Sequence, residues 1–214
     1  MKAVIFDLDG TLLDTLDDIA LCANTVRADL GLSPHPVDAY RHFVGDGLRE
    51  LLTRAMPARV LRGNGMRLRA LRFRRLYAQH ALDETRPYPG IARMLDGVVR
   101  RGLPMAVVSN KPQRFTEICV KRLLPRWRFE VVRGARTGIP LKPDPTAPLA
   151  AARKMRVQPA DILYLGDTSV DMKAANAAGM FAVGALWGFR DADELRRFGA
   201  RVLIKKPRDL LPLL

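Results

Sequence analysis

The side chains with the clearest chemical potential in this chain are carboxylates that follow apolar runs. Asp7 and Asp9 end the run AVIFDLD near the N-terminus, and Asp167 ends the run ILYLGD, with Asp171 close behind it. Alternate residues of a strand point to the same side, so Asp7 and Asp9 can converge on one substrate. Neighbouring carboxylates repel one another and lose solvation when buried, and a divalent cation is the natural partner that relieves both effects.

Other polar residues also follow strand-like runs or stand in a loop. Ser109 and Asn110 end the run MAVVSN, and Lys142 stands in the segment LKPDP. A hydroxyl and an amide near the start of a helix can donate hydrogen bonds to phosphoryl oxygens, because anions are favoured there. Lys142 would supply a fixed positive charge for a pentacoordinate transition state.

Together these residue types suit phosphoryl transfer with a metal. One carboxylate can attack phosphorus and form an aspartyl-phosphate, and a second can protonate the leaving oxygen and later deprotonate water. Mg²⁺ prefers oxygen ligands, and Asp7 and Asp167 fit as ligands with Asp171 in support. Each motif alone also has an ordinary structural interpretation: DGT and GDTSVD as turns, SNK as a capped helix start, and KP as a loop.

The elements that must position these residues alternate in type. Helical patterns separate strand-like segments, which predicts an α/β fold with a doubly wound parallel sheet covered by helices on both faces. The expected strands are AVIFDLD, PMAVVSN, FEVVRG, DILYLGD, FAVGAL and RVLI. In open parallel sheets, function gathers beyond the carboxyl ends of the strands. The predicted fold would therefore collect the candidate residues at one edge of the sheet.

The segment between the first strand and the others is helical in pattern. Residues 15–87 carry helical periodicity, broken by prolines and glycines, with no evident strand. The sequence predicts a catalytic core of residues 1–14 and 88–214, with a small all-helical cap domain at 15–87. Entry near Thr15 and exit near Pro87 would make a two-stranded hinge, on which the cap would move as a lid.

The predicted cap is rich in arginine. The basic residues are Arg54, Arg59, Arg62, Arg67, Arg69, Arg72, Arg74 and Arg75. Three interpretations stand: a solvated helix face, a surface that attracts an anionic substrate, or a docking site for an acidic partner or nucleic acid. The buried stripe of the solvated helix would be Leu68, Leu71, Phe73 and Leu76.

Two glycines in the cap segment VGDGL are candidates for substrate specificity. Gly45 and Gly47 leave backbone N–H groups open to close approach, so a small carboxylate could be held there. The alternative is a simple turn between two helices.

Composition limits the other classes of function. With 48% hydrophobic residues the 214-residue chain can bury a sizeable core, and no apolar run approaches the roughly 20 residues of a membrane span. The N-terminus has no signal-peptide pattern. Cys22 and Cys119 lack metal-type spacing and are expected to be free thiols of a cytoplasmic protein.

The net charge of +14 permits nucleic-acid binding but does not favour it. Most of the basic residues are arginine, a skew that a GC-rich genome also produces, and no DNA-reading motif accompanies them. We expect a small phosphorylated substrate as the partner, neither nucleic acid nor membrane, and a monomer or homodimer.

The motifs resemble those of the haloacid dehalogenase superfamily of phosphatases. DLDGTLLDT resembles the first motif of that family, SNK the second, LKPDP the lysine motif and GDTSVD the acidic fourth. The position of the insertion is similar to that of members with a small helical cap. VGDGL, PYPGI and the stretch from GDT to DMKAANAAGM resemble phosphoglycolate phosphatases. The resemblance implies Asp7 as the nucleophile and Asp9 as the general acid/base, with the backbone carbonyl of Asp9 also on Mg²⁺.

The expected function is therefore Mg²⁺-dependent hydrolysis of a small phosphomonoester similar to 2-phosphoglycolate, through an aspartyl-phosphate. A phosphosugar mutase similar to β-phosphoglucomutase or a pyrophosphatase could use the same core residues. A non-enzymatic binding protein on this scaffold is disfavoured, because the nucleophile, the lysine and the acidic pair are all present.

Overall fold

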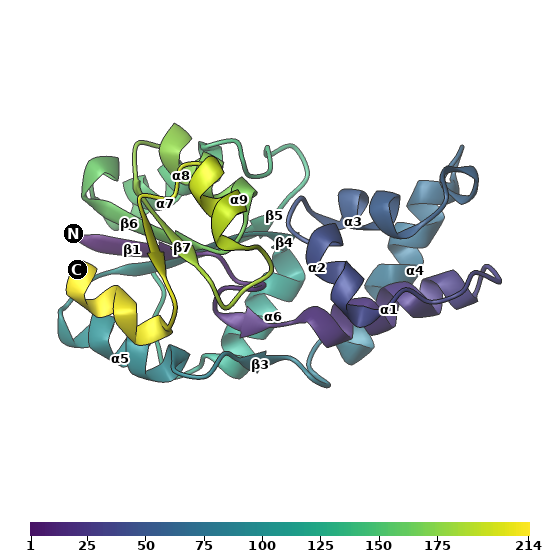
Figure 1. Cartoon of the computed structure of the whole chain (residues 1–214), viewed down its shortest axis with the longest axis horizontal. Helices are drawn as coiled ribbons and strands as arrows, with labels where there is room; N and C mark the ends of the chain where they lie inside the picture. Colours follow the sequence, from purple (N-terminus) through teal and green to yellow (C-terminus); the bar gives the residue numbers. More distant parts are fainter.

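The computed structural model describes all 214 residues, and a six-stranded parallel sheet with its covering helices forms one half of the molecule (Figure 1). The strand order is β5-β4-β1-β6-β7-β8, and every neighbouring pair is parallel. The bounds are β1 (Ala3–Phe6), β4 (Met105–Pro112), β5 (Val131–Ala135), β6 (Ile162–Gly166), β7 (Phe181–Ala185) and β8 (Val202–Ile204). The predicted α/β fold with a parallel sheet is confirmed.

Helices cover both faces of the sheet, which explains why the strands are continuous apolar runs. Val4 and Phe6 of β1 belong to the apolar cluster on one face, and Ala3 and Ile5 to the cluster on the other. The first face is covered by α5 (Ile91–Arg100), α6 (Gln113–Leu123) and the 3₁₀ helix η4 (Pro207–Leu213). The second is covered by α7 (Thr146–Met155), α8 (Ser169–Ala177) and α9 (Ala192–Arg197), with the short η3 (Pro159–Asp161) before β6.

Residues 15–87, called the helical insertion below, lie beyond one end of the sheet (Figure 1). Its helices are α1 (Leu16–Ala28), α2 (Tyr40–Phe43), α3 (Leu48–Ala55) and α4 (Gly65–His80), with the short η1 (Val37–Ala39) and η2 (Ala58–Val60). They surround an apolar cluster of their own, to which the core adds Phe115 and Phe189. An antiparallel pair of short strands, β2 (Leu13–Asp14) and β3 (Arg86–Pro87), joins the insertion to the core at the place where the sequence predicts a hinge.

The arginine-rich helix α4 turns a different face inward from the one predicted. Phe73 and Leu76 are buried as expected, but Leu68 and Leu71 are 52% and 51% exposed, so the predicted stripe is wrong for those two leucines. Beside Leu76, the inward stripe is Met66, Ala70, Phe73 and Tyr77. The spacing of these four residues, four, three and four positions, follows the helical repeat, which places Leu68 and Leu71 on the flank.

None of the helices combines the length and the hydropathy that a membrane crossing requires. Cys22 and Cys119 are buried free thiols, as predicted. Burial raises the pKa of Cys22 to about 12 and that of Cys119 to about 11, so both stay protonated and unreactive near neutral pH.

Candidate functional site

A buried lysine brings together two of the predicted carboxylates at the carboxyl ends of the strands. Lys142 lies in the loop between β5 and α7, and its Nζ lies 2.8 Å from Oδ1 of Asp7 and 2.7 Å from Oδ1 of Asp171. It also donates to the backbone carbonyl of Val108 at 3.0 Å. Burial opposes the charge on Lys142, but the two carboxylates outweigh it and hold the pKa of Lys142 well above the ordinary lysine value. The lysine therefore stays charged inside the site.

Three carboxylates form a buried acidic cluster beside this lysine. One oxygen each of Asp7, Asp167 and Asp171 lies within 4.8 Å of the others. Thr11 Oγ1 donates to Asp167 at 2.7 Å, the backbone N–H of Phe189 donates to it at 2.8 Å, and these bonds fix its orientation.

The charges in this cluster are not balanced by the protein alone. Burial and the neighbouring charge of Asp171 raise the pKa of Asp7 to about 7. Burial, Asp171 and Asp7 likewise raise the pKa of Asp167 well above the usual carboxyl value. A hard divalent cation would offset this repulsion by its positive charge, and carboxylate oxygens are the ligands that Mg²⁺ prefers. The cluster therefore fits Mg²⁺ in ligand type.

Asp171 has a second role at the start of α8. Its carboxylate accepts hydrogen bonds from the backbone N–H and the hydroxyl of Thr168, at 3.1 and 2.6 Å, in a capping box. This cap fixes the first turn of α8. The carboxylate that supports the cluster is therefore also the one that orients the helix.

Asp9 is turned toward a different lysine. Nζ of Lys111 lies 2.8 and 3.1 Å from the two carboxylate oxygens of Asp9, while Asp7 is paired with Lys142. The Asp9 carboxylate is outside the acidic cluster, and the predicted role of its backbone carbonyl as a metal ligand stays a prediction. Asp7 and Asp9 nevertheless line the same cavity, and their predicted convergence on one substrate stays a prediction.

Ser109 and Asn110 lie in the last four residues of β4, which continues two residues beyond the predicted end, to Pro112. The Asn110 side chain donates to the carbonyls of Lys142 at 2.9 Å and Gly45 at 3.0 Å, and it accepts from the Lys142 backbone N–H at 2.8 Å. It therefore braces the lysine loop and touches the helical insertion. The predicted donation of hydrogen bonds from Ser109 and Asn110 to a phosphate stays a prediction.

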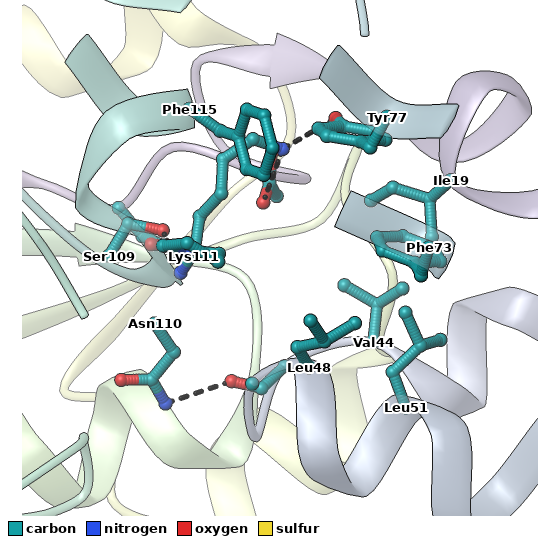
Figure 2. A pocket seen from close by; sticks show the side chains of 15 residues that line it. Ile19, Val44, Leu48, Leu51, Phe73, Tyr77, Ser109, Asn110, Lys111 and Phe115 are labelled. Atoms are coloured by element: carbon teal, nitrogen blue, oxygen red, sulfur yellow. Dashed lines mark hydrogen bonds and ion pairs between the residues drawn. The ribbon is translucent and has the colours of Figure 1, made fainter. Parts of the chain in front are cut away.

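Lys111 is a residue of this site that the sequence analysis missed. Its side chain is buried between Asp9 and Tyr77 of α4, whose hydroxyl lies 2.6 Å from Nζ (Figure 2). Burial opposes the charge, but Asp9 and Tyr77 outweigh it and hold the pKa of Lys111 above the ordinary lysine value. The available signal was its place in SNK, directly after the two residues already assigned to the site.

A cavity of about 60 Å³ lies between the strand ends and the helical insertion (Figure 2). Its polar lining includes Asp7, Asp9, Ser109, Asn110 and Lys111. Its apolar lining includes Ile19, Val44, Leu48, Leu51, Phe73 and Phe115. None of the eight arginines of the predicted basic run lines it. Substrate would therefore meet acidic groups and one lysine at one side and an apolar wall at the other.

Gly45 and Gly47 also line this cavity, and both have positive φ, +132° and +90°. The Gly45 carbonyl accepts from Asn110, and Gly47 is the N-cap of α3. The structure thus shows the helix-to-helix turn, and the predicted contact of these two glycines with a substrate carboxylate stays a prediction.

Comparison with known proteins agrees with this arrangement. The sequence model of the haloacid dehalogenase-like hydrolases matches residues 4–185. The chain is 33% identical to a phosphoglycolate phosphatase of Chromobacterium violaceum, over 100% of this chain and 96% of that protein. It is also 33% identical to an N-acetylmuramic acid 6-phosphate phosphatase of Pseudomonas aeruginosa, over 100% of this chain and 95% of that protein.

A solved structure shares the whole fold. The crystal structure of a predicted phosphoglycolate phosphatase from Haemophilus somnus 129PT superposes with a TM-score of 0.92 at 25% identity, covering 100% of this chain and 97% of that one. The match includes the helical insertion as well as the sheet, because it covers the whole of this chain. The chain therefore belongs to the haloacid dehalogenase-like hydrolases, as a phosphoric monoester hydrolase that resembles the phosphoglycolate phosphatases.

Proposed function

We propose that this protein is a Mg²⁺-dependent phosphatase that hydrolyses 2-phosphoglycolate or a closely similar small phosphomonoester through an aspartyl-phosphate on Asp7. The observation that carries the proposal is the placement of Lys142, 2.8 Å from Asp7 and 2.7 Å from Asp171, while Asp7 and Asp9 line one cavity. A nucleophile and a separate acid/base then face one space, and a fixed cation is paired with the nucleophile.

The metal would be held by the carboxylates of Asp7, Asp167 and Asp171, with the Asp9 carbonyl as the further ligand that the family resemblance implies. When bound, Mg²⁺ supplies positive charge that offsets the negative charge of the phosphate as a nucleophile approaches.

In the first half of the reaction an Asp7 oxygen attacks phosphorus and the bond from phosphorus to the leaving oxygen breaks. Asp9, once it has left its ion pair with Lys111 and taken up a proton from solvent, gives that proton to the leaving oxygen, so the alcohol leaves neutral. In the second half Asp9 takes a proton from water, the resulting hydroxide attacks phosphorus, and the Asp7 carboxylate is regenerated. Lys142 holds positive charge beside the transferring group in both halves.

The helical insertion acts as a cap domain over this site, with residues 1–14 and 88–214 as the core and 15–87 as the cap. Two observations support this division. The insertion supplies most of the apolar lining of the cavity, and the chain passes between core and insertion only at the paired strands β2 and β3. An apolar cover would exclude bulk water from the acyl phosphate until hydrolysis.

The relatives favour a short substrate. A phosphoglycolate phosphatase and an N-acetylmuramic acid 6-phosphate phosphatase are equally similar to the chain in sequence, but several further relatives are also phosphoglycolate phosphatases. We therefore place 2-phosphoglycolate first among the substrates and the sugar phosphate second.

The experiment is phosphate release by the purified protein from 2-phosphoglycolate, N-acetylmuramic acid 6-phosphate, β-glucose 1-phosphate and pyrophosphate, each with Mg²⁺ or with EDTA. We expect the highest kcat/KM for 2-phosphoglycolate and no turnover with EDTA. Isomerisation of the glucose phosphate that requires a bisphosphate activator would identify a mutase, and fastest cleavage of pyrophosphate would identify a pyrophosphatase. Phosphate release from none of the four would refute a phosphatase of small esters.

A further inference from the structure

Lys111 has no part in the chemistry described above, yet it is buried at the centre of the site. We propose that Lys111 is the specificity-determining residue: it binds the carboxylate of a short phosphate ester, and this exchange of partners frees Asp9 from its ion pair. The inference rests on the proposed function, because it names the feature of the substrate that the same site recognises.

The first observation is that Lys111 is the one positively charged side chain among the 15 residues that line the cavity. The lysine of the phosphate end, Lys142, is already engaged by Asp7, Asp171 and a backbone carbonyl. The arginines of the insertion do not line the cavity. A second anionic group on the substrate, remote from the phosphate, therefore finds its counter-charge only at Lys111.

The second observation is the way Lys111 is held. Its side chain is only 4% exposed, and its Nζ contacts both oxygens of Asp9 and the hydroxyl of Tyr77. A lysine ammonium has three donors, and these partners occupy them. In the absence of substrate, Asp9 is thus the counter-ion of Lys111.

The two observations together give a coupling between recognition and chemistry. For Asp9 to reach a leaving oxygen it must turn away from Lys111, which would leave a buried ammonium group without a counter-ion. An incoming carboxylate takes the place of Asp9 and removes that penalty. An ester with a neutral group in the same position does not, so it would occupy the cavity while Asp9 stays paired.

The apolar lining of the cavity strengthens the discrimination between charged and neutral substrates. Leu48, Leu51 and Phe73 form an apolar wall, and charge–charge attraction is stronger in such a medium than in water. Tyr77 comes from α4, so Lys111 is held from the insertion side as well as from the core. The carboxylate site is therefore complete only when the insertion is seated on the core.

The test compares two substrates that differ only in the group remote from the phosphate: 2-phosphoglycolate, which has a carboxylate there, and 2-hydroxyethyl phosphate, which has a neutral hydroxymethyl group. For the native protein we expect kcat/KM to favour the carboxylate by about 10² or more, as sites built around a polar group do. Lys111→Met, which keeps the length but not the charge, should reduce this ratio to below about 10, and Lys111→Arg should restore part of it. Lys121→Met is the matched control, because it removes an exposed lysine of α6 that does not line the cavity and should keep the native ratio.

A merely structural role for Lys111 predicts something else: both substrates would slow by the same factor in Lys111→Met and the ratio would not move. That result, or a native protein that hydrolyses both esters without preference, would overturn the inference while leaving the phosphatase function intact. A native protein that hydrolyses neither ester would overturn the proposed 2-phosphoglycolate substrate as well as the inference.

If Lys111→Met fails to fold, the native protein alone still decides. Two non-hydrolysable inhibitors, 3-phosphonopropionate and 3-hydroxypropylphosphonate, again differ only in the carboxylate. We expect the carboxylated phosphonate to inhibit at a concentration about ten times lower. Equal inhibition constants would contradict a carboxylate site.

Discussion

Asp7 and Asp9 stand two residues apart, and the structure gives each its own lysine. Lys142 contacts Asp7 and Lys111 contacts Asp9, so the nucleophile and the acid/base lie in different electrostatic surroundings. This separation is what a two-step phosphoryl transfer needs, because one carboxylate must attack while the other must exchange a proton.

The nucleophile is tested by Asp7→Asn. The amide is nearly isosteric with the carboxylate but is a poor nucleophile, so we expect turnover to fall by at least about 10⁴ while the fold persists. Phosphate release and circular dichroism measure the two properties, and mass spectrometry checks for deamidation back to aspartate. Asp193→Asn, on the exposed side of α9, is the control and should keep native turnover. An Asp7→Asn protein free of aspartate that works at the native rate would disprove the mechanism.

The raised pKa of Asp7 gives a prediction for metal binding. With a pKa of about 7, against an ordinary value of 3.8, folded metal-free protein holds a proton that the unfolded chain has lost between those pH values. The Asp7 contribution to the free energy of unfolding therefore falls as pH rises through this window. At pH 8 Mg²⁺ meets an ionised carboxylate, whereas at pH 6 it must displace a proton.

We therefore expect Mg²⁺ to raise the melting temperature more at pH 8 than at pH 6, as measured by calorimetry with EDTA-treated protein. In Asp7→Asn the increment should be smaller and should lose most of its pH dependence. An equal or larger increment at pH 6 in the native protein would show that Asp7 is not part of the metal site.

Among the elements, the turn after β1 is the most constrained. Gly10 has φ of +86°, and a Cβ on it would lie 2.2 Å from Oδ2 of Asp167 and 2.8 Å from the Phe189 ring. The turn thus passes directly against the acidic cluster, where a side chain has no room.

Gly10→Ala should therefore abolish Mg²⁺-dependent activity by displacing Asp167. Gly31→Ala is the matched control: Gly31 also has positive φ, +67°, but nothing lies within 4 Å of its Cβ position. It should cost only about 1–2 kcal/mol of stability for the unfavourable backbone conformation and leave kcat unchanged. Melting temperature and phosphate release separate the two effects. Activity that survives in Gly10→Ala would refute the tight contact.

At this scale the sequence predicts the regular elements well and the contacts between them poorly. The six expected strands and the residues at their ends are found because continuous apolar runs such as AVIF and ILYLG are typical of a sheet buried on both faces. The helix η4 was missed because PRDLLPL contains two prolines and has no clear helical period.

The contacts between elements are harder to predict. The inward face of α4 was misjudged because the positions of α1 and α3, and not the sequence of α4 itself, decide which flank of α4 is covered. The pair formed by Asp9 and Lys111 spans 102 residues, a separation over which no local pattern carries information.

Across the whole molecule, the net charge of +14 is concentrated outside the active cavity. Arg72 is paired with Asp29 and Arg69 is half-buried, whereas Arg67, Arg74 and Arg75 are exposed. The three exposed arginines are better probes of long-range attraction than Arg69 and Arg72, because replacing them breaks no ion pair and removes no half-buried side chain.

We expect Arg67, Arg74 and Arg75, replaced together by glutamine, to lower kcat/KM for an anionic substrate by a few-fold at low salt and to leave kcat unchanged. Steering by surface charge is screened within about 8 Å at physiological ionic strength, so the difference should vanish as salt is added. Steady-state kinetics from low to moderate salt measures it. Tight binding of duplex DNA or RNA by the native protein, steeply salt-dependent and lost in the variant, would instead identify the surface as a nucleic-acid site.

The central position of β1 also determines when the protein can fold during its synthesis. β1 is translated first, yet its two neighbours are β4, which begins at Met105, and β6, which ends at Gly166. At roughly 5–20 residues per second, the ribosome needs on the order of ten to thirty seconds to deliver both neighbours. The helices of residues 15–87 can form in that time because their contacts are local, but AVIF stays an unpaired apolar strand. Asp7 thus directly follows a strand that needs protection from aggregation until both of its neighbours have been made. A ribosome that stalls before residue 166 would release a chain in which β1 lacks its complete neighbour β6.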